Sequence, residues 1–332
     1  MHHLDLVLAG QTVSGGLKAQ FTLARWLAPL FARLMPEVPR GHPALGLMTL
    51  NFAANALGLD NAATPMGLKA MRELQTLNPT PDIATDAQIL FLVINTASVT
   101  LFPVTIFAYR AQLGAADPTD VFIPLLLASY VATLAGVALT GSIQRLRLFD
   151  PVVLAYLGGM TALIGGVAWW FMRLPVAEMQ VQSALWSNLL LLLAVSAMII
   201  GALWQRVNVY EAFVEGAKEG FQVAVGIIPY LVAMLVAIAL LRASGVMGWA
   251  IAVVKSGVVA MGWDARWVEG LPVGIMKSLS GSGARALMID TLKTQGADSF
   301  VGRLVSIIQG SSETTFYVLA VYFGAVNIRN TR

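Results

Sequence analysis

The apolar runs of this 332-residue chain are too long to be core segments of a soluble domain. A helix needs about 20 apolar residues to cross a bilayer. Three uninterrupted runs reach that length: Val121–Thr140, Val152–Met172 and Leu185–Trp204. Charged residues make up only 12% of the chain, whereas soluble domains carry about 25%. The sequence therefore predicts an all-α, polytopic membrane helical bundle.

The scarcity of reactive side chains excludes several functions. The basic residues are scattered singly, so no patch tracks phosphates and nucleic acid is not expected as a partner. There is no cysteine, and His42 is the only histidine beyond the first three residues. Phosphate-loop and nucleophile-elbow motifs are also missing. We therefore expect no catalytic residue, no metal site and no cofactor.

Four further apolar segments are interrupted by small or polar residues. They are Ala44–Leu59, Ala87–Tyr109, Leu271–Ile289 and Leu304–Val326. Irregular backbone at membrane depth is tolerated only where it is buried in protein or lines a water-filled cavity. Broken helices are therefore the part of the sequence most informative about function.

Two of these segments resemble each other. A shift of 214 residues aligns Leu90–Ala111 with Leu304–Ala325 at seven identical positions, including Ser98 with Ser312 and Thr100 with Thr314. The polar stretch 95–100 thus coincides with 309–314. Apolar identities alone could arise by chance from a restricted alphabet, but coincident hydroxyl residues inside membrane spans are harder to explain that way. Matching interruptions in two halves indicate the binding site of a transporter.

A cluster of polar residues precedes the first interrupted repeat. Asn51, Asn55, Asp60, Asn61 and Thr64 lie within fourteen residues of otherwise apolar sequence. Pro65 suits the first turn of a new helix, and a helix N-terminus at membrane depth can receive a polar or anionic group. The alternative is that these side chains only satisfy backbone groups freed at a helix break.

Glu313 is the strongest single candidate for a functional residue. It is the only charged residue in Ile307–Val326, and ionising a carboxyl in lipid costs several kcal/mol. Charged residues inside membrane spans mark ion or proton paths. Glu313 therefore predicts that solute movement is coupled to H+ or Na+. Pairing with Arg285 and direct hydrogen bonding to a solute are the alternatives. Nearby Ser280, Ser282, Ser311, Ser312 and Thr314 are weaker candidates, because small polar residues also join helices.

Two pairs of motifs resemble a known family. Residues 37–46 (EVPRGHPALG) and 50–65 (LNFAANALGLDNAATP) closely resemble spore maturation protein A. Residues 209–221 (VYEAFVEGAKEGF) and 228–234 (IPYLVAM) resemble spore maturation protein B. The chain looks like a fused form of both, in the nucleoside-recognition (gate) family, which is similar to parts of concentrative nucleoside transporters and of the ferrous-iron transporter.

The resemblance implies a domain plan and a set of site residues. Residues 1–112 would form the first gate-type repeat, residues 113–205 the central transmembrane helices, and residues 206–332 the second repeat, with the repeats inverted and containing hairpin-like broken helices. Only fourteen residues precede Gly15, so the first repeat is expected to lack its N-terminal helix. Together with the aligned threonines, the solute site would comprise Asn55, Asp60, Asn61, Asn95, Ser98, Thr100, Ser280, Ser282, Gln309, Ser312 and Thr314, with Glu313 as the coupling residue.

These observations predict a multipass protein of the bacterial cytoplasmic (inner) membrane that binds and moves a small polar solute, nucleoside-like or a small anion. Its expected partners are the lipid bilayer and that solute, and a homo-oligomer is compatible with the sequence. The competing hypothesis is a non-transporting scaffold for envelope or spore maturation. A scaffold would present exposed faces such as Glu211–Glu219, a stretch that predicts an amphipathic surface helix.

Overall fold

Helices form every regular element of the computed structural model within the residues that it describes. These are residues 27–331, except 57–59, 98, 102, 175, 205–207, 216, 219–231, 233–235, 237–239 and 241–242. The N-terminal region expected to lack a helix lies outside them, as does part of the predicted surface helix 211–219.

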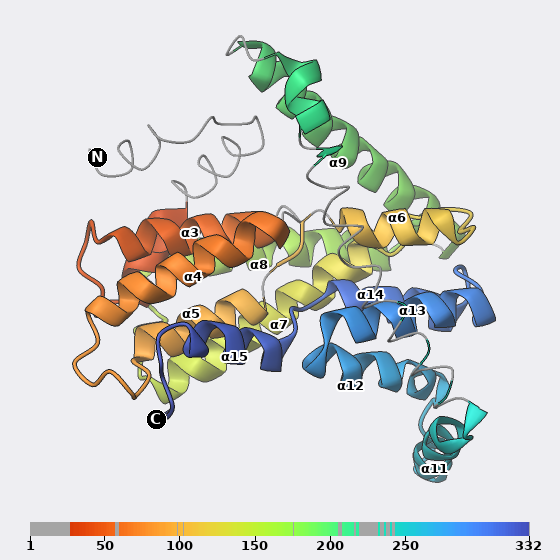
Figure 1. Ribbon diagram of the computed structural model, residues 1–332. Coiled ribbons are helices and arrows are strands. Elements are labelled where there is room, and N and C mark those ends of the chain that lie inside the picture. Colours follow the sequence, from red (N-terminus) through yellow and green to blue (C-terminus); the bar gives the residue numbers. More distant parts are fainter. Residues whose placement is uncertain are drawn as a thin grey trace.

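The helices follow the chain as shown in Figure 1. They are α3 (Pro43–Ala56), α4 (Asp60–Thr76), α5 (Asp86–Thr96), α6 (Val104–Gln112), α7 (Phe122–Ile143), α8 (Pro151–Met172), α9 (Val176–Trp204), α11 (Val246–Ala260), the short 3-10 helix η1 (Arg266–Gly270), α12 (Leu271–Leu279), α13 (Gly281–Gln295), α14 (Phe300–Gly310) and α15 (Thr315–Gly324).

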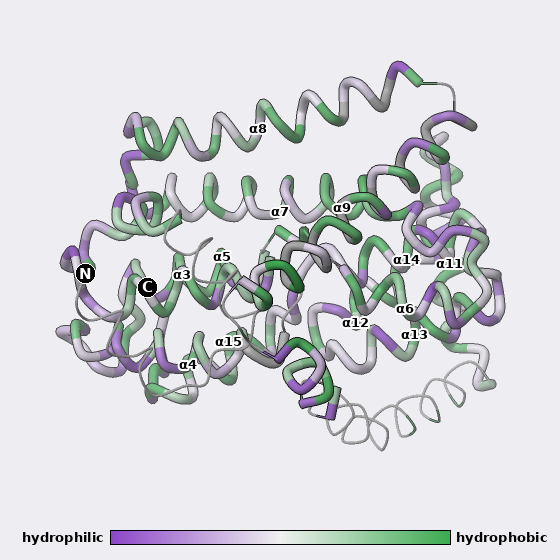
Figure 2. The backbone as a smooth tube through the Cα atoms, turned by 90° about the horizontal axis from the view of Figure 1, so that it is seen from above, coloured by the Kyte–Doolittle hydropathy of each residue, from purple (hydrophilic) through white to green (hydrophobic). Residues whose placement is uncertain are grey.

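The three long apolar runs are helical, as predicted, in α7, α8 and α9. Within the described part of the chain, α7 is the helix long and apolar enough to cross a membrane by length and composition. Figure 2 shows α8 running alongside α7 at one edge of the molecule, and the two helices are in contact.

Two large hydrophobic cores lie within the described part of the chain, and each includes helices from both halves of the sequence. One core joins α3, α4 and α5 with α15, through residues such as Met71, Phe91 and Tyr322. The other joins α12, α13 and α14 with α6 and α7, through residues such as Phe107 and Met288. Figure 1 shows α3, α4, α5 and α15 at the left and α12, α13 and α14 at the right, with α7 extending from one group to the other. The exchange of α6 and α15 brings the two broken segments together.

Each broken segment has one well-capped start and an irregular middle. In α5, Thr85 and Gln88 form a reciprocal capping box, and in α14 the hydroxyl of Ser299 accepts from the N–H of Gly302. Residues 97–103, the first break, separate α5 from α6 and end at Pro103, which has no N–H to continue a helix. Residues 311–314, the second break, separate α14 from α15.

The local prediction for Pro65 is wrong. Helix α4 begins at Asp60, so Pro65 lies inside the helix and not in its first turn. Its missing N–H removes one backbone hydrogen bond, and the helix is held by packing instead, with Ala70, Met71 and Leu74 buried. An anion site at a helix start beside Pro65 is therefore excluded.

Candidate functional site

The two breaks are hydrogen-bonded to each other. The main-chain N–H of Glu313 donates to the carbonyl oxygen of Thr96 at 2.8 Å, and the hydroxyl of Thr100 donates to the carbonyl oxygen of Gly310 at 3.0 Å. Thr96 and Gly310 are the last residues of α5 and α14. Because the final carbonyls of a helix have no partner within it, each break satisfies the open end of the other half's helix.

The tips of two helical hairpins abut the same breaks. At the end of α3, the carbonyl oxygen of Ala56 accepts from the N–H of Leu101 in the first break at 2.8 Å. At the start of α13, a Cβ on Gly281 would lie 2.7 Å from the hydroxyl oxygen of Thr314 in the second break. Two hairpin tips and two breaks therefore converge on one region.

Two asparagines expected to bind solute contact each other in this region. The Asn55 amide donates to the Asn95 side-chain oxygen at 2.7 Å, and both residues are buried. The phenol of Tyr322 interacts with the side chains of Asn51 and Asn95, and it is close enough to Glu313 for an electrostatic interaction. The Asn51 side-chain oxygen is buried and accepts no hydrogen bond within the described structure. Asn51 and Tyr322 were missing from the predicted site.

The hydroxyl residues of α7 hold the first break in place. The Ser129 hydroxyl accepts from the N–H of Thr100 at 3.2 Å, and the Thr133 hydroxyl donates to the carbonyl oxygen of Ala97. Sequence reasoning treated α7 as a plain membrane span and missed both residues. The available signal was their spacing, since residues four apart share one face of a helix.

The remaining predicted residues fall into three groups. Ser280 caps α13 by accepting from the N–H of Gly283, and its oxygen lies 3.2 Å from that of Ser282. Gln309, in the last turn of α14, is buried and its side-chain oxygen has no hydrogen-bond donor among the described atoms. The others are Ser312, which belongs to the second break, Asp60 and Asn61, which begin α4, and Ser98, which lies outside the described residues. Their roles remain predictions.

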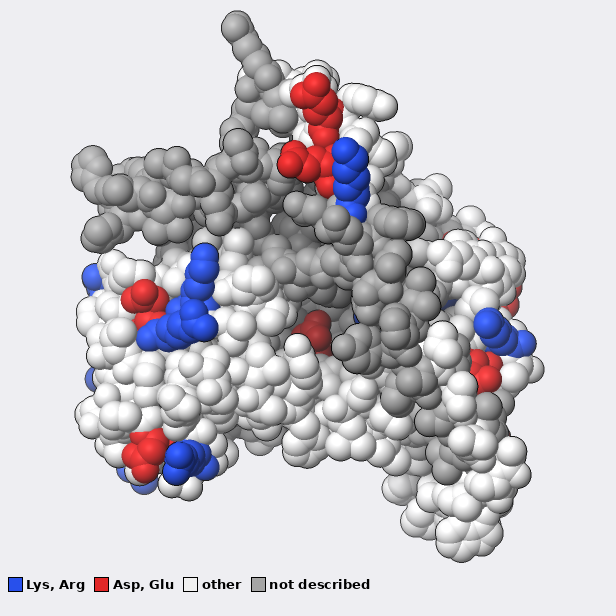
Figure 3. All heavy atoms as spheres, in the orientation of Figure 1, with Lys and Arg blue, Asp and Glu red and all other residues white. Residues whose placement is uncertain are grey.

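Charges are sparse around this region. Figure 3 shows Lys, Arg, Asp and Glu mostly at the periphery of one face, with acidic atoms recessed near its centre. Arg285, the predicted alternative partner of Glu313, stands over the ring of Tyr109 at 6.0 Å from its centroid. No group of three His, Cys, Asp or Glu side chains in the described chain is placed to hold a metal ion.

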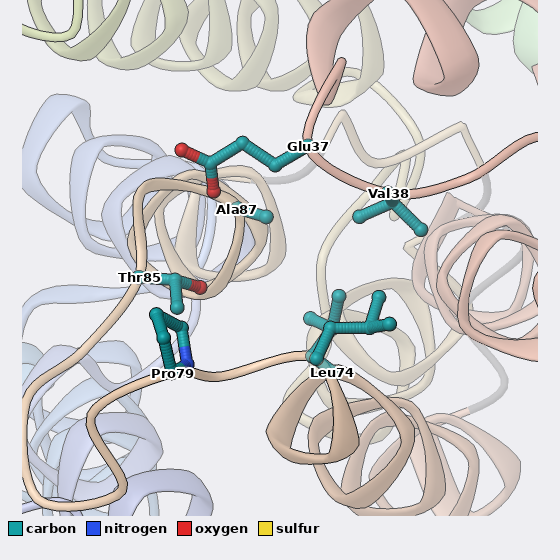
Figure 4. A pocket seen from close by; sticks show the side chains of 7 residues that line it. Glu37, Val38, Leu74, Pro79, Thr85 and Ala87 are labelled. Atoms are coloured by element: carbon teal, nitrogen blue, oxygen red, sulfur yellow. The ribbon is translucent and has the colours of Figure 1, made fainter.

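A separate pocket opens away from the breaks. Figure 4 shows Glu37 and Val38, from the loop before α3, opposite Leu74 and Pro79. Thr85 and Ala87 at the start of α5 complete its lining with Leu77. The break lies at the other end of α5, a helix of 11 residues, which is about 16 Å long. This mostly apolar pocket is therefore distinct from the candidate site.

The sequence analysis also missed a buried cluster of charges at the far end of α6. The Arg110 side chain is fully buried and lies 2.7 Å from a carboxylate oxygen of Asp120. The other Asp120 oxygen is 2.7 Å from Nε of Arg303 on α14, and Arg110 donates to the carbonyl oxygen of Ala297 before that helix. This cluster ties α6 to the second half of the chain.

Parts of the chain are similar to known proteins. Residues 224–329 match the family model described as Gate, nucleoside recognition. The chain is 46% identical over 125 residues to spore maturation protein B of Bacillus subtilis (strain 168), a match covering 38% of this chain and 68% of that protein. It is 38% identical over 114 residues to spore maturation protein A of the same organism, covering 34% of this chain and 58% of the relative.

The chain therefore belongs to the spore maturation protein B family. The resemblance to both spore maturation proteins and to the gate domain, predicted from the motifs, is confirmed. No solved structure matches the chain.

Proposed function

We propose that this chain is a multipass protein of the bacterial cytoplasmic membrane that binds a small polar solute where the two breaks cross and carries it across the bilayer. The observation that supports this most is the reciprocal pair of hydrogen bonds from Glu313 to Thr96 and from Thr100 to Gly310. Discontinuous helices that meet in this way build the substrate sites of many secondary transporters.

Correspondences between the halves support an inverted repeat. Adding 214 to the bounds of α5, Asp86–Thr96, gives 300–310, the bounds of α14. At one end of the molecule the N–H of Ala84 donates to the carbonyl oxygen of Asn330 at 2.9 Å. At the other end, the N–H of Ala116 donates to a carboxylate oxygen of Asp298 at 2.9 Å. Under the shift of 214 residues, position 84 corresponds to 298 and position 116 corresponds to 330. The two hydrogen bonds therefore join the same pair of corresponding positions, and the donor comes from the first half of the sequence in both.

Exposed apolar surface supports the membrane placement. Large side chains on α8 and α9 face outward, including Leu163 at 65% exposure, Leu192 at 63% and Trp186 at 43%. Soluble monomers seldom expose large contiguous apolar patches, whereas a lipid-facing helix requires such side chains. With α7 beside them, these helices would form the central transmembrane block.

The chemistry of the crossing suits a solute rich in hydrogen-bonding groups. The side chains gathered there are amides and hydroxyls, with Asn51 and Gln309 offering buried oxygens that accept no hydrogen bond in the described structure. The printed description of the gate family, nucleoside recognition, fits such a solute. Glu313 is the ionisable group of the second break, and we propose that it binds the coupling H+ or Na+.

The test is the thermal stability of the purified full chain in detergent, with nucleosides, dicarboxylates and metal ions, with and without Na+. A ligand that binds the native state raises the melting temperature in a saturable manner. We expect Glu313→Gln to remove the dependence of this shift on Na+ or on pH while the protein still assembles. Glu178→Gln, an exposed position on α9, serves as the matched control.

Absence of any ligand-induced shift in a well-folded sample would contradict the transport proposal. It would favour the scaffold hypothesis, in which the exposed aromatic side chains Tyr210 and Phe213 of the helical residues 209–215 contact a partner. Failure of Glu313→Gln to assemble would assign Glu313 a structural role.

A further inference from the structure

The separate pocket shown in Figure 4 is built from three segments whose positions are fixed by packing. Val38 comes from the loop before α3, Leu74 from the last turn of α4 and Ala87 from the first turn of α5. These side chains are 3%, 2% and 5% exposed. The capping box of Thr85 and Gln88 holds the start of α5. The walls therefore belong to the packed core, as in most small-molecule sites, which are largely preformed.

The size of this pocket limits the molecule that it can hold. Its volume is about 180 Å³, which corresponds to about six water molecules at roughly 30 Å³ each. Drug-sized ligands occupy pockets of about 300–1,000 Å³. The pocket therefore suits a smaller molecule, of about six to nine non-hydrogen atoms on the same scale.

The polar groups that line the pocket are one carboxylate and one hydroxyl. Figure 4 shows the Glu37 side chain extending from its loop toward the start of α5, while Val38 and Leu74 point toward each other across the cavity. Within the described part of the chain, the Glu37 carboxylate takes part in no ion pair or hydrogen bond. The hydroxyl oxygen of Thr85 accepts from the N–H of Gln88 at 3.3 Å and retains a second lone pair.

The charges near the pocket favour a cationic occupant. Glu37 is the one charged residue of the lining, and Asp86 adds negative charge to the first turn of α5. Of the basic residues on either side of Glu37 in the chain, Arg33 is paired with Asp150 at 3.0 Å, and Arg40 does not line the pocket. A positive group beside Glu37 is therefore attracted, whereas a carboxylate or phosphate is repelled.

We infer that this pocket binds a small free amine, a primary ammonium group that carries a short alkyl or aryl chain. The ammonium donates to the Glu37 carboxylate and to the hydroxyl oxygen of Thr85, and the hydrocarbon part packs against the apolar walls, which include Leu77. The ethanolamine headgroup of a lipid fits less well, because its phosphate would lie close to Glu37. The inference goes beyond the proposed function, since the pocket is distinct from the crossing of the breaks.

The experiment compares phenethylamine with its neutral analogue 2-phenylethanol on the full chain in detergent, by ligand-observed NMR titration. The alcohol has the same size and measures partition of the probe into the micelle. We expect saturable binding of the amine, and we expect Glu37→Gln to weaken it by about 5-fold, the upper range for an exposed ion pair. Glu73→Gln, which removes a carboxylate of α4 outside the pocket lining, is the matched control and should leave amine binding unchanged.

Two further variants locate the bound amine. Leu77 is 36% exposed, so Leu77→Trp should be tolerated by the fold while its larger side chain narrows the cavity and weakens binding. Glu313→Gln, at the second break, should leave amine binding unchanged. Loss of binding in Glu313→Gln would place the amine at the crossing and overturn the inference.

Three other results would also overturn the inference. They are equal affinity for amine and alcohol, an amine preference that survives Glu37→Gln, and unchanged binding in Leu77→Trp. Displacement of phenethylamine by phosphatidylethanolamine, and not by phosphatidylglycerol, would identify the occupant as a lipid headgroup and would likewise count against a free amine. None of these results bears on solute binding at the crossing, which is tested by different probes.

Discussion

The hydroxyl of Thr100 donates to the carbonyl oxygen of Gly310 at 3.0 Å, although 210 residues separate them in the chain. With the reverse bond from Glu313 to Thr96, it links two helices that each end in the middle of the molecule. The breaks are therefore parts of one structure, and either break alone would leave helix-end carbonyls unsatisfied.

Thr100→Val should test how much this link contributes to stability. The substitution keeps the shape of the side chain but leaves the Gly310 carbonyl without its donor, which costs about 1–3 kcal/mol. Chemical denaturation in detergent measures the change. Thr76→Val removes an exposed bond within α4 and should alter stability by less than about 0.5 kcal/mol. Equal effects of the two variants would show that the crossing adds no stability.

Gly67→Ala should disturb the packing of α15 on α4. A Cβ at Gly67 would overlap the ring and hydroxyl of Tyr322, and overpacking of this kind costs about 1–3 kcal/mol. Tyr322→Leu in the same protein should relieve part of the loss. Gly158→Ala on α8 meets nothing within 4 Å and is expected to be neutral or stabilising. A stable Gly67→Ala protein with unchanged melting temperature would contradict the packing described here.

Arg110→Met should be the most destabilising single change considered. It leaves the Asp120 carboxylate, shared with Arg303, without one of its two cations in a buried position, and breaking such a pair costs about 3–5 kcal/mol. Lys255→Ala removes a pair whose side chains are 48% and 30% exposed, for which about 0–1 kcal/mol is expected. Comparable losses in unfolding measurements would mean that Arg110 is solvated in the native state.

Gly281→Ala should couple to Thr314. The added methyl group would lie 2.7 Å from the Thr314 hydroxyl oxygen and must displace it. The affinity for a solute that contacts Thr314 should therefore fall. Combining it with Thr314→Ala removes the clash, and the double variant should bind no worse than Thr314→Ala alone. A double-mutant cycle on ligand-induced melting shifts measures this interaction. Additive effects would separate the two residues functionally.

Much of the local structure could be predicted from sequence because its causes are local. The three long apolar runs became α7, α8 and α9, and the predicted interruptions coincide with the gaps between α5 and α6 and between α14 and α15. The prediction that a helix starts at Pro65 was wrong, because proline favours the first turn of a helix but can also lie in a later turn when the helix is well packed. The polar composition of residues 50–65 marks this stretch as a candidate site. Only the tertiary contacts distinguish Asn51 and Asn55, which are buried and hydrogen-bonded, from Asp60 and Asn61, which begin α4.

What the sequence by itself determined is the three long apolar helices, the places where two further helices break and the resemblance to the family, since apolar length, breakers and motifs act over short stretches of chain. Only the tertiary structure decided that α6 and α15 exchange cores, that α7 holds the first break through Ser129 and Thr133, and that Arg110 is enclosed by charges from both halves. Hydrogen bonds across some 200 residues depend on how the halves pack, because a freed carbonyl can be satisfied by any donor that packing brings near it.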